Sequence, residues 1–280
     1  MIKALQKDQV LLDDIVAANA DRAGFHLWWL GQSGYLIQWQ GKHLLIDPYL
    51  SDSLTKKYAA TDKPHIRMTE RVIAPERLDF IDIVSSSHNH TDHLDGETLI
   101  PLMAANPGLT FIIPRANRAF VANRIQHDIN FPIGLKAGDS ITLANDFTIH
   151  GIPAAHNELE KDEAGNCKFM GYVFQFGPYS IYHSGDTLWR EEILAALKPF
   201  EIDVAILPIN GNKPERRVAG NLNAKEAVAL GKQIKASCVI PCHYDMFTFN
   251  TVAPDEFITQ AQQQQQAHQV LQCGERLTVR

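Results

Sequence analysis

The segment HNHTDH at 88–93 places three histidines and one aspartate within six residues. It directly follows a short apolar run that is typical of a strand. Because residues two apart in an extended chain point to the same side, His88 and His90 are expected to lie side by side and grip one cation. Asp92 and His93 follow where the chain bends toward a helix, and we expect them to face a second cation. Imidazole and carboxylate ligands suit Zn²⁺, Mn²⁺ or Fe²⁺.

A complete metal site needs further ligands from other parts of the chain. His156 lies in the loop PAAHN, Asp186 in the loop HSGDT and His243 in the loop PCHYD. Each of these ligand-type side chains comes just past the carboxyl end of an apolar, strand-like run. We therefore predict that these three residues join the 88–93 segment in one site.

The elements that must position these residues follow from the apolar pattern. Short apolar or alternating runs predict strands at 26–30, 35–39, 43–46, 80–85, 110–113, 140–143, 147–152, 171–176, 180–183, 204–208 and 238–241, with one more after Gly274. Helical periodicity predicts helices at 2–20, 96–105, 116–126, 189–197, 224–235 and 254–270, with Asn223 as an N-cap. Residues 48–78 are predicted to form a long irregular loop. A loop of this length in a compact domain usually has a function, such as that of a lid. Without repeats or linker-like stretches, residues 1–280 are expected to form a single layered domain.

Composition limits the classes of partner. The formal net charge is −6, which weighs against a nucleic-acid binder that works through a basic face. The four cysteines form no C-x-x-C pair, which is typical of reduced thiols in a cytoplasmic protein. No stretch approaches the roughly 20 apolar residues of a membrane span, and the polar N-terminus lacks a signal-peptide core. The sequence leaves the oligomeric state open, including a homo-oligomer.

Most of the other histidines and the cysteines are expected to be structural. We expect surface or satisfied core positions for the histidines at 26, 43, 65, 127, 150 and 268. His183 precedes Asp186 on a strand and is a candidate for supporting a metal ligand. Cys238 and Cys242 are expected to pack in or near the core.

A polar loop after the 204–208 strand supplies candidates for contact with substrate. Arg216 and Arg217 can hold a phosphate or carboxylate through paired hydrogen bonds. Asn210 and Tyr244 are further candidates for hydrogen bonds near the metals. This loop favours a small anionic molecule as the substrate.

The H-x-H-x-D-H segment, followed by spaced His, Asp and His, resembles the metallo-β-lactamase superfamily. The resemblance implies an α/β fold, a four-layer αββα sandwich with a two-metal site at one edge. It implies that His88, His90 and His156 bind the first metal, that Asp92, His93 and His243 bind the second, and that Asp186 bridges both. The segments IDPYLSDS at 46–53, SHNHTDHLD at 87–95 and IPCHYDMF at 240–247 are similar to the L-ascorbate-6-phosphate lactonase branch.

The resemblance implies a metal-dependent hydrolase in which two divalent cations share a bound water and make hydroxide available at neutral pH. Asp92 would also orient the attacking hydroxide, and Asp186 would fix the metal spacing, so both are catalytic candidates. A lactonase acting on a small anionic, phosphorylated sugar-acid type of lactone is the first hypothesis. A phosphodiesterase or nuclease of the same fold is the second. A non-hydrolytic redox or metal-binding module is the third.

Overall fold

The computed structural model describes residues 1–143 and 147–280, and two β-sheets lie at its centre. The first sheet has the strand order β13-β1-β2-β3-β4-β5-β6. Its strands are β1 (Phe25–Gly31), β2 (Gly34–Trp39), β3 (Lys42–Ile46), β4 (Ile83–Ser85), β5 (Thr110–Pro114), β6 (Ile133–Leu135) and β13 (Arg276–Val279). Strands β1 to β3 pair antiparallel, as the short turns between them predict, and β3 to β6 pair parallel.

The second sheet has the order β12-β11-β10-β9-β8-β7. Its strands are β7 (Ser140–Leu143), β8 (Phe147–Pro153), β9 (Met170–Phe176), β10 (Tyr179–His183), β11 (Val204–Pro208) and β12 (Cys238–Cys242). Strands β7 to β10 pair antiparallel, whereas β10, β11 and β12 pair parallel. Both sheets therefore combine an antiparallel part with a parallel part.

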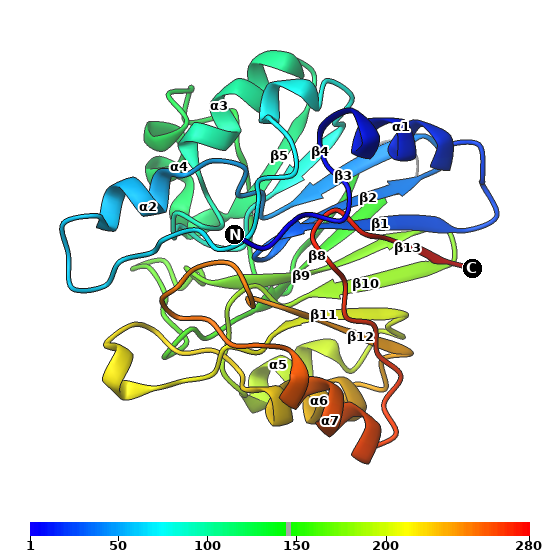
Figure 1. Ribbon diagram of the computed structural model, residues 1–280. Coiled ribbons are helices and arrows are strands. Elements are labelled where there is room, and N and C mark those ends of the chain that lie inside the picture. The colour runs from blue at the N-terminus through cyan, green and yellow to red at the C-terminus, as the bar shows by residue number, and fades with distance from the viewer. Residues whose placement is uncertain (144–146) are drawn as a thin grey trace.

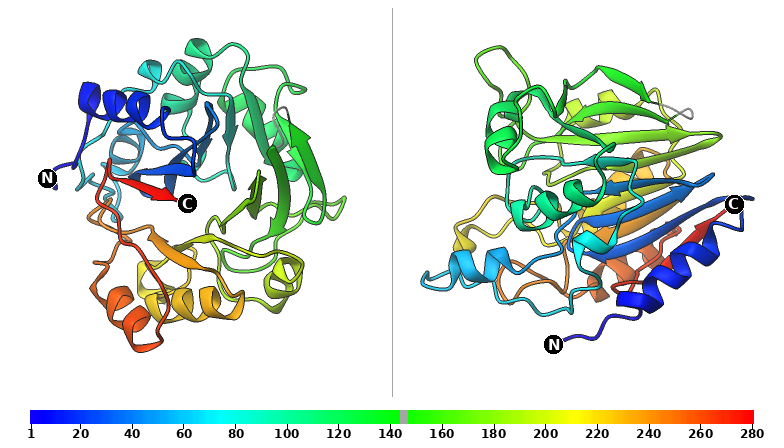
Figure 2. Two further views of the ribbon diagram at one scale, coloured as in Figure 1. Left: turned by 90° about the vertical axis from the view of Figure 1, so that its right-hand side faces the viewer. Right: turned by 90° about the horizontal axis from the view of Figure 1, so that it is seen from above.

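Helices flank the two sheets on their outer sides (Figure 1, Figure 2). On the side of the first sheet are α1 (Asp8–Ala18), α3 (Gly96–Ala105) and α4 (Arg118–Arg124), with α2 (Ser53–Tyr58) at one end. The second sheet is covered by α5 (Glu191–Leu197), α6 (Ala224–Gln233) and α7 (Asp255–Gln263). The layers thus follow the order α, β, β, α, which agrees with the sandwich expected from the sequence.

Aromatic side chains join the inner faces of the sheets. Phe25 on β1 meets Phe176 on β9 edge to face with ring centroids 5.4 Å apart, and Trp39 on β2 meets Phe147 on β8 at 5.7 Å. Every residue of β1 and β11 is buried, which explains their near-continuous apolar sequences. One buried apolar cluster draws on both sheets, and we infer from it that the chain folds as one domain.

The predicted strands and helices are largely present, and the differences have tertiary causes. The first helix starts only at Asp8, because residues before it are held by backbone hydrogen bonds such as Leu5 N to Cys273 O at 2.8 Å. The last helix ends at Gln263, because the chain beyond it runs along β12 through Val239 N to Ala267 O at 2.9 Å. The segment 48–78 is not wholly irregular, since it contains α2 and a short 3₁₀ turn at 75–77. Strand β6 was not predicted from the sequence.

None of the helices in the described parts of the chain is both long and apolar enough to cross a membrane. The four cysteines are free thiols rather than disulfides. Cys242 is buried beside Ser33, with Oγ 3.8 Å from Sγ, so it packs in the core as expected.

Candidate metal centre

The predicted ligands come from loops at strand ends of both sheets. The segment 88–93 follows β4 in the first sheet, and the loops after β8, β10 and β12 come from the second. Gly185 allows the loop after β10 to approach the loop after β4. A Cβ on this glycine, which has φ +59°, would lie 2.6 Å from the Cβ of Ser87. The two sheets therefore bring their ligand loops together at one edge.

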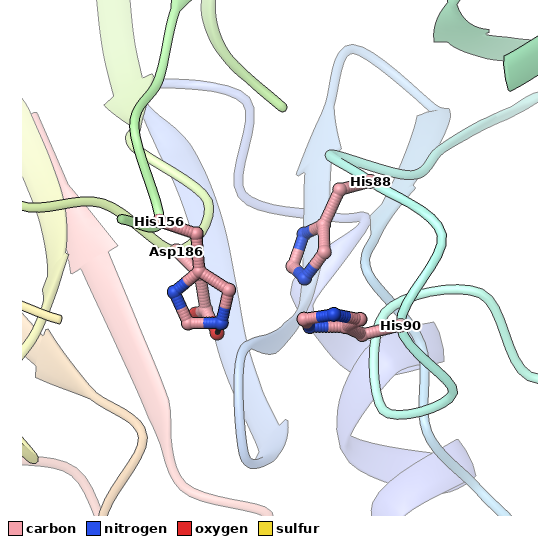
Figure 3. A group of neighbouring side chains, drawn as sticks. All are labelled: His88, His90, His156 and Asp186. Carbon is pink, nitrogen blue, oxygen red and sulfur yellow. Dashed lines mark ion pairs between the residues drawn. The ribbon is translucent and has the colours of Figure 1, made fainter. Parts of the chain in front are cut away.

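The structure brings the seven predicted ligands into two adjacent groups. In each group, the side chains offer ligand atoms that all lie within 4.8 Å of one another. The first group, shown in Figure 3, contains His88, His90, His156 and Asp186. The second group contains Asp92, His93 and His243. Apart from Asp186, which the resemblance makes a bridge, these are the two sets of ligands that the resemblance implies.

Asp186 lies between the two groups. Its Oδ2 is 3.3 Å from Nε2 of His156 in the first group. The same oxygen is 3.3 Å from Nε2 of His243 and 3.4 Å from Nε2 of His93 in the second group. One carboxylate oxygen therefore faces both sets of imidazoles, which is the position that a bridging ligand requires.

Neighbouring groups fix the orientation of the histidine rings. The Nδ1 of His93 donates to Oδ2 of Asp47 at 2.7 Å, and the Nδ1 of His156 donates to the carbonyl oxygen of Gly220 at 2.8 Å. Such bonds place the hydrogen on Nδ1 and leave Nε2 as the atom directed to the centre. His183 is fully buried and bonds through Nε2 to the carbonyl oxygen of Ser33 at 3.0 Å.

Gln32 is a further polar contact of the centre that sequence reasoning did not find. Its Nε2 donates to Oδ2 of Asp92 at 2.8 Å and lies 3.0 Å from Nε2 of His243. It sits in the turn after β1 with φ 51°. Its only signal in the sequence is its place in the Gly31–Gly34 turn, because contact with Asp92 depends on the folded chain.

Without bound cations, only protonated imidazoles can balance the negative charge of the carboxylates in this centre. Burial opposes ionisation of Asp186, but the positive charges of His243, His93 and His156 hold its pKa well below the usual range. Burial also opposes charge on His243, yet Asp186 and Asp92 raise its pKa to about 9. The carboxylates thus draw protons onto imidazoles that lie in a buried site. Divalent cations would satisfy the same carboxylates without those protons.

Buried ligand atoms without hydrogen-bond partners are a second sign that these side chains fit metal ions. Three buried ligand atoms make no hydrogen bond with any described part of the chain: Nε2 of His88, Nε2 of His93 and Oδ1 of Asp186. Buried polar atoms without partners are rare, and an ion is one of the few groups that can account for three together. Imidazole nitrogens with carboxylate oxygens suit Zn²⁺, Mn²⁺ and Fe²⁺.

A cavity of about 450 Å³ opens onto the centre. The residues around it are the predicted ligands His90, Asp92, His156, Asp186 and His243, together with side chains of α2, α4 and the loop 213–219. Its lining includes three cationic side chains, those of Lys57, Lys63 and Arg124. The carboxylates in the same lining are the two of the metal centre.

The four side chains predicted to bind substrate all bond to other parts of the chain, and Nδ2 of Asn210 donates to Oδ1 of Asn250 at 3.0 Å. Arg216 donates to the carbonyl oxygen of Asn210 at 2.7 Å and to Oδ1 of Asn250 at 2.9 Å. Arg217 pairs with Asp62, and Tyr244 is buried and donates to the carbonyl oxygen of Leu271. None of these four lies among the described residues that line the cavity.

Arg124 and His65 line the cavity, although no pattern in the sequence distinguishes them. Arg124 donates through Nη1 to the carbonyl oxygens of Asn89 and Leu94, at 2.7 and 3.1 Å, and thereby contacts the ligand segment itself. His65 was expected to be a structural histidine, but its half-buried side chain lies in the cavity wall. Neither residue belongs to a recognisable motif.

The fold and the cluster agree with comparisons to known proteins. The beta-lactamase superfamily domain matches residues 26–243, and the chain belongs to that superfamily. A UPF0173 metal-dependent hydrolase of Caldivirga maquilingensis is 26% identical over 232 residues, which cover 83% of this chain and 87% of the relative. A Shigella boydii protein named "Probable L-ascorbate-6-phosphate lactonase UlaG" is 26% identical over 262 residues, which cover 83% of this chain and 73% of the relative.

Solved structures show the same fold. Igni18, a metallo hydrolase from Ignicoccus hospitalis, superposes with a TM-score of 0.67 at 22% identity, covering 92% of this chain and 99% of that one. An isothiocyanate hydrolase from Delia radicum gut bacteria superposes with a TM-score of 0.71 at 19% identity, covering 91% and 100%. Family, fold and cluster together support a metal-dependent hydrolase of the metallo-β-lactamase fold.

Proposed function

We propose that this protein is a two-metal lactonase that opens a small anionic lactone, with Zn²⁺ or Mn²⁺ as the metal and Fe²⁺ as the third option. His88, His90 and His156 hold the first ion, and Asp92, His93 and His243 hold the second. Asp186 bridges them. The observation that carries this assignment is the position of Asp186 Oδ2, at 3.3 Å from an imidazole nitrogen of each group.

When bound, such cations lower the pKa of water and polarise the substrate oxygen. The two carboxylates then have different tasks. The side chain of Asp92 is 16% exposed, whereas that of Asp186 is 3% exposed. Asp92 is therefore the carboxylate that attacking water reaches, and its oxygen orients the water by accepting a hydrogen bond. Gln32 holds Asp92 in place by donating a hydrogen bond to its Oδ2.

The cationic cavity supports an anionic substrate. Lys57, Lys63 and Arg124 line it in a chain whose formal net charge is −6. A local excess of positive charge concentrates anions at the site, even where the whole protein is acidic. The similarity to the protein named as an ascorbate-6-phosphate lactonase supports a lactone among anionic substrates.

A phosphodiesterase is the second candidate, because the same cations and metal ligands suit a phosphodiester equally. The decisive experiment measures metal content per chain, together with hydrolysis of a simple lactone and of bis(p-nitrophenyl) phosphate. About two metals per chain with lactone turnover supports the lactonase. Turnover of the phosphodiester alone supports the second candidate. A chain that takes up neither Zn²⁺ nor Mn²⁺ would contradict both.

A further inference from the structure

His65 lines the cavity that opens onto the metal centre. It follows α2, and the ligands His90, Asp92 and His243 line the same cavity. It belongs to neither group of metal-ligand side chains. A substrate in this cavity would thus meet the metal centre and the His65 ring together.

The hydrogen bonding of His65 fixes its tautomer. Its Nδ1 lies 2.7 Å from the carbonyl oxygen of Lys63. A carbonyl oxygen only accepts, so Nδ1 carries the hydrogen and the neutral ring has its lone pair on Nε2. This Nε2 makes no hydrogen bond to the chain within residues 1–143 and 147–280. The ring therefore keeps one nitrogen free to exchange a proton.

Aromatic rings hold the imidazole in position. The ring of Tyr58 lies 4.4 Å from it, centroid to centroid, and the rings of Phe249 and Phe247 lie at 5.0 and 5.6 Å. The backbone next to His65 is held by a further contact, because Nζ of Lys63 donates to the carbonyl oxygen of Arg217 at 2.6 Å. A catalytic group held by packing is ready before substrate binds.

The surroundings keep His65 neutral. Burial lowers its pKa, and the positive charges of His243 and Lys57 act in the same direction. The bond to the carbonyl oxygen of Lys63 and the negative charge of Asp92 oppose that shift without reversing it. At neutral pH, the free nitrogen is thus able to accept a proton.

We propose that His65 is a catalytic residue that carries a proton from the attacking water to the leaving oxygen through Nε2. This inference rests on the proposed hydrolase function. Because the pKa of the attacking water is lowered, that water has already lost its first proton to solvent, and attack on a lactone or on an aryl ester needs no further base. Once its oxygen has bonded to the carbonyl carbon of the lactone, the proton that remains on this oxygen passes to Nε2. When the carbon–oxygen bond of the ring breaks, the electron pair stays on the ring oxygen, which takes that proton. The product is a hydroxy acid, and His65 returns to its neutral form.

The experiment that tests this role compares two substrates whose leaving groups differ in their need for a proton. Opening a lactone releases an alkoxide, which needs a proton, whereas 4-nitrophenyl acetate releases 4-nitrophenolate, which leaves without one. In metal-loaded His65→Gln, we expect kcat for γ-butyrolactone to fall about 100-fold and kcat for the aryl ester to change less than about twofold. Metal content should match that of the wild type. His127→Gln, at an exposed histidine outside the cavity lining, is the matched control.

A second variant separates proton transfer from a packing role. Imidazole in solution should restore lactone turnover to His65→Ala, because the 450 Å³ cavity has room for it, and it should not affect the control. Equal loss on both substrates, loss of bound metal, or absence of rescue would overturn the proton-carrier role. Full lactone activity in His65→Gln would also overturn it. If the wild type hydrolyses neither substrate, the proposed function fails and this inference fails with it.

Discussion

Asp47 accepts a hydrogen bond from Nδ1 of His93 at 2.7 Å, and both side chains are fully buried. Asp47 stands directly after β3, and it also accepts from the backbone nitrogen of Ser87 at 2.7 Å. One carboxylate thus orients a metal-centre histidine and anchors the start of the ligand loop after β4. The position of His93 therefore depends on a residue 46 positions earlier in the chain.

Asp47→Asn should weaken metal binding without removing a ligand. The amide retains the shape of the side chain, but it loses the charge that supports the His93 imidazole. Loss of such a partner lowers metal affinity about 10- to 100-fold. Calorimetric titration of metal-free protein with Zn²⁺ measures the change, and Asp13→Asn on the exposed face of α1 is the control. Equal affinities in wild type and Asp47→Asn would show that this hydrogen bond does not tune the centre.

The effect of replacing Asp186 should differ from that of replacing a ligand in only one group. Asp186→Asn removes the charge that faces both groups, so we expect both ions to bind more weakly. His156→Gln and His243→Gln should each release one ion of the two and retain the other. Metal content after dialysis against a weak chelator distinguishes the cases. Loss of a single ion from Asp186→Asn would contradict the bridging position.

The metal centre was accessible from the sequence because its ligands follow two local rules. His88 to His93 stand together in the chain, and His156, Asp186 and His243 each follow an apolar strand. Strand ends converge at a sheet edge, so these positions in the chain predicted a single site. The division of the ligands between two ions followed from the resemblance to the metallo-β-lactamase superfamily.

The groups around the centre were not accessible in the same way. Gln32, Asp47 and His65 have no special spacing relative to the ligands, and each reaches the site through contacts made only in the folded chain. Arg216 shows the opposite situation. It lies in a polar loop at the correct end of the sheet, but carbonyl and amide oxygens of its own chain occupy its guanidinium. Position in a loop alone does not tell which cationic side chains line the cavity.

Lys57→Gln should reduce the preference for anionic substrates. Lys57 is exposed and lines the cavity, with Nζ 3.2 Å from Oγ1 of Thr91. For an exposed charge, the loss is about 1 kcal/mol, or roughly fivefold in kcat/KM for an anionic lactone, with little change for a neutral one. The adjacent Lys56 pairs with Glu97 and is not part of the described lining, so Lys56→Gln is a matched control.

Ionic strength provides a check on the same prediction. The difference between Lys57→Gln and wild type should shrink as salt is added, because mobile ions screen exposed charges. A loss of activity that is equal for neutral and anionic lactones, or one that salt does not reduce, would assign Lys57 a structural role rather than a role in recognising charge.

His43 predicts a pH dependence of folding stability that is independent of the metal centre. Its Nε2 accepts from Nε2 of Gln38 at 2.8 Å, so the ring is neutral. Burial lowers its pKa to about 4, despite the opposing effect of Asp82. Between the ordinary pKa of 6.5 and about 4, the unfolded chain binds a proton that the folded chain does not. The contribution of His43 to the free energy of unfolding is therefore complete above pH 6.5, and it is lost as the pH falls toward 4.

Urea unfolding of metal-free protein at pH 7.5 and pH 5.0 tests this expectation. The lower pH lies about 1.5 units below the ordinary pKa of 6.5. Over that range the neutral, buried His43 ring loses about 2 kcal/mol of its contribution to the free energy of unfolding. His43→Gln has no group to titrate at this position, so its free energy of unfolding should fall by about 2 kcal/mol less than that of the wild type. His127→Gln, at an exposed position, should follow the wild type. If His43→Gln lost as much stability as the wild type on acidification, protonation of His43 would not be the cause of the loss.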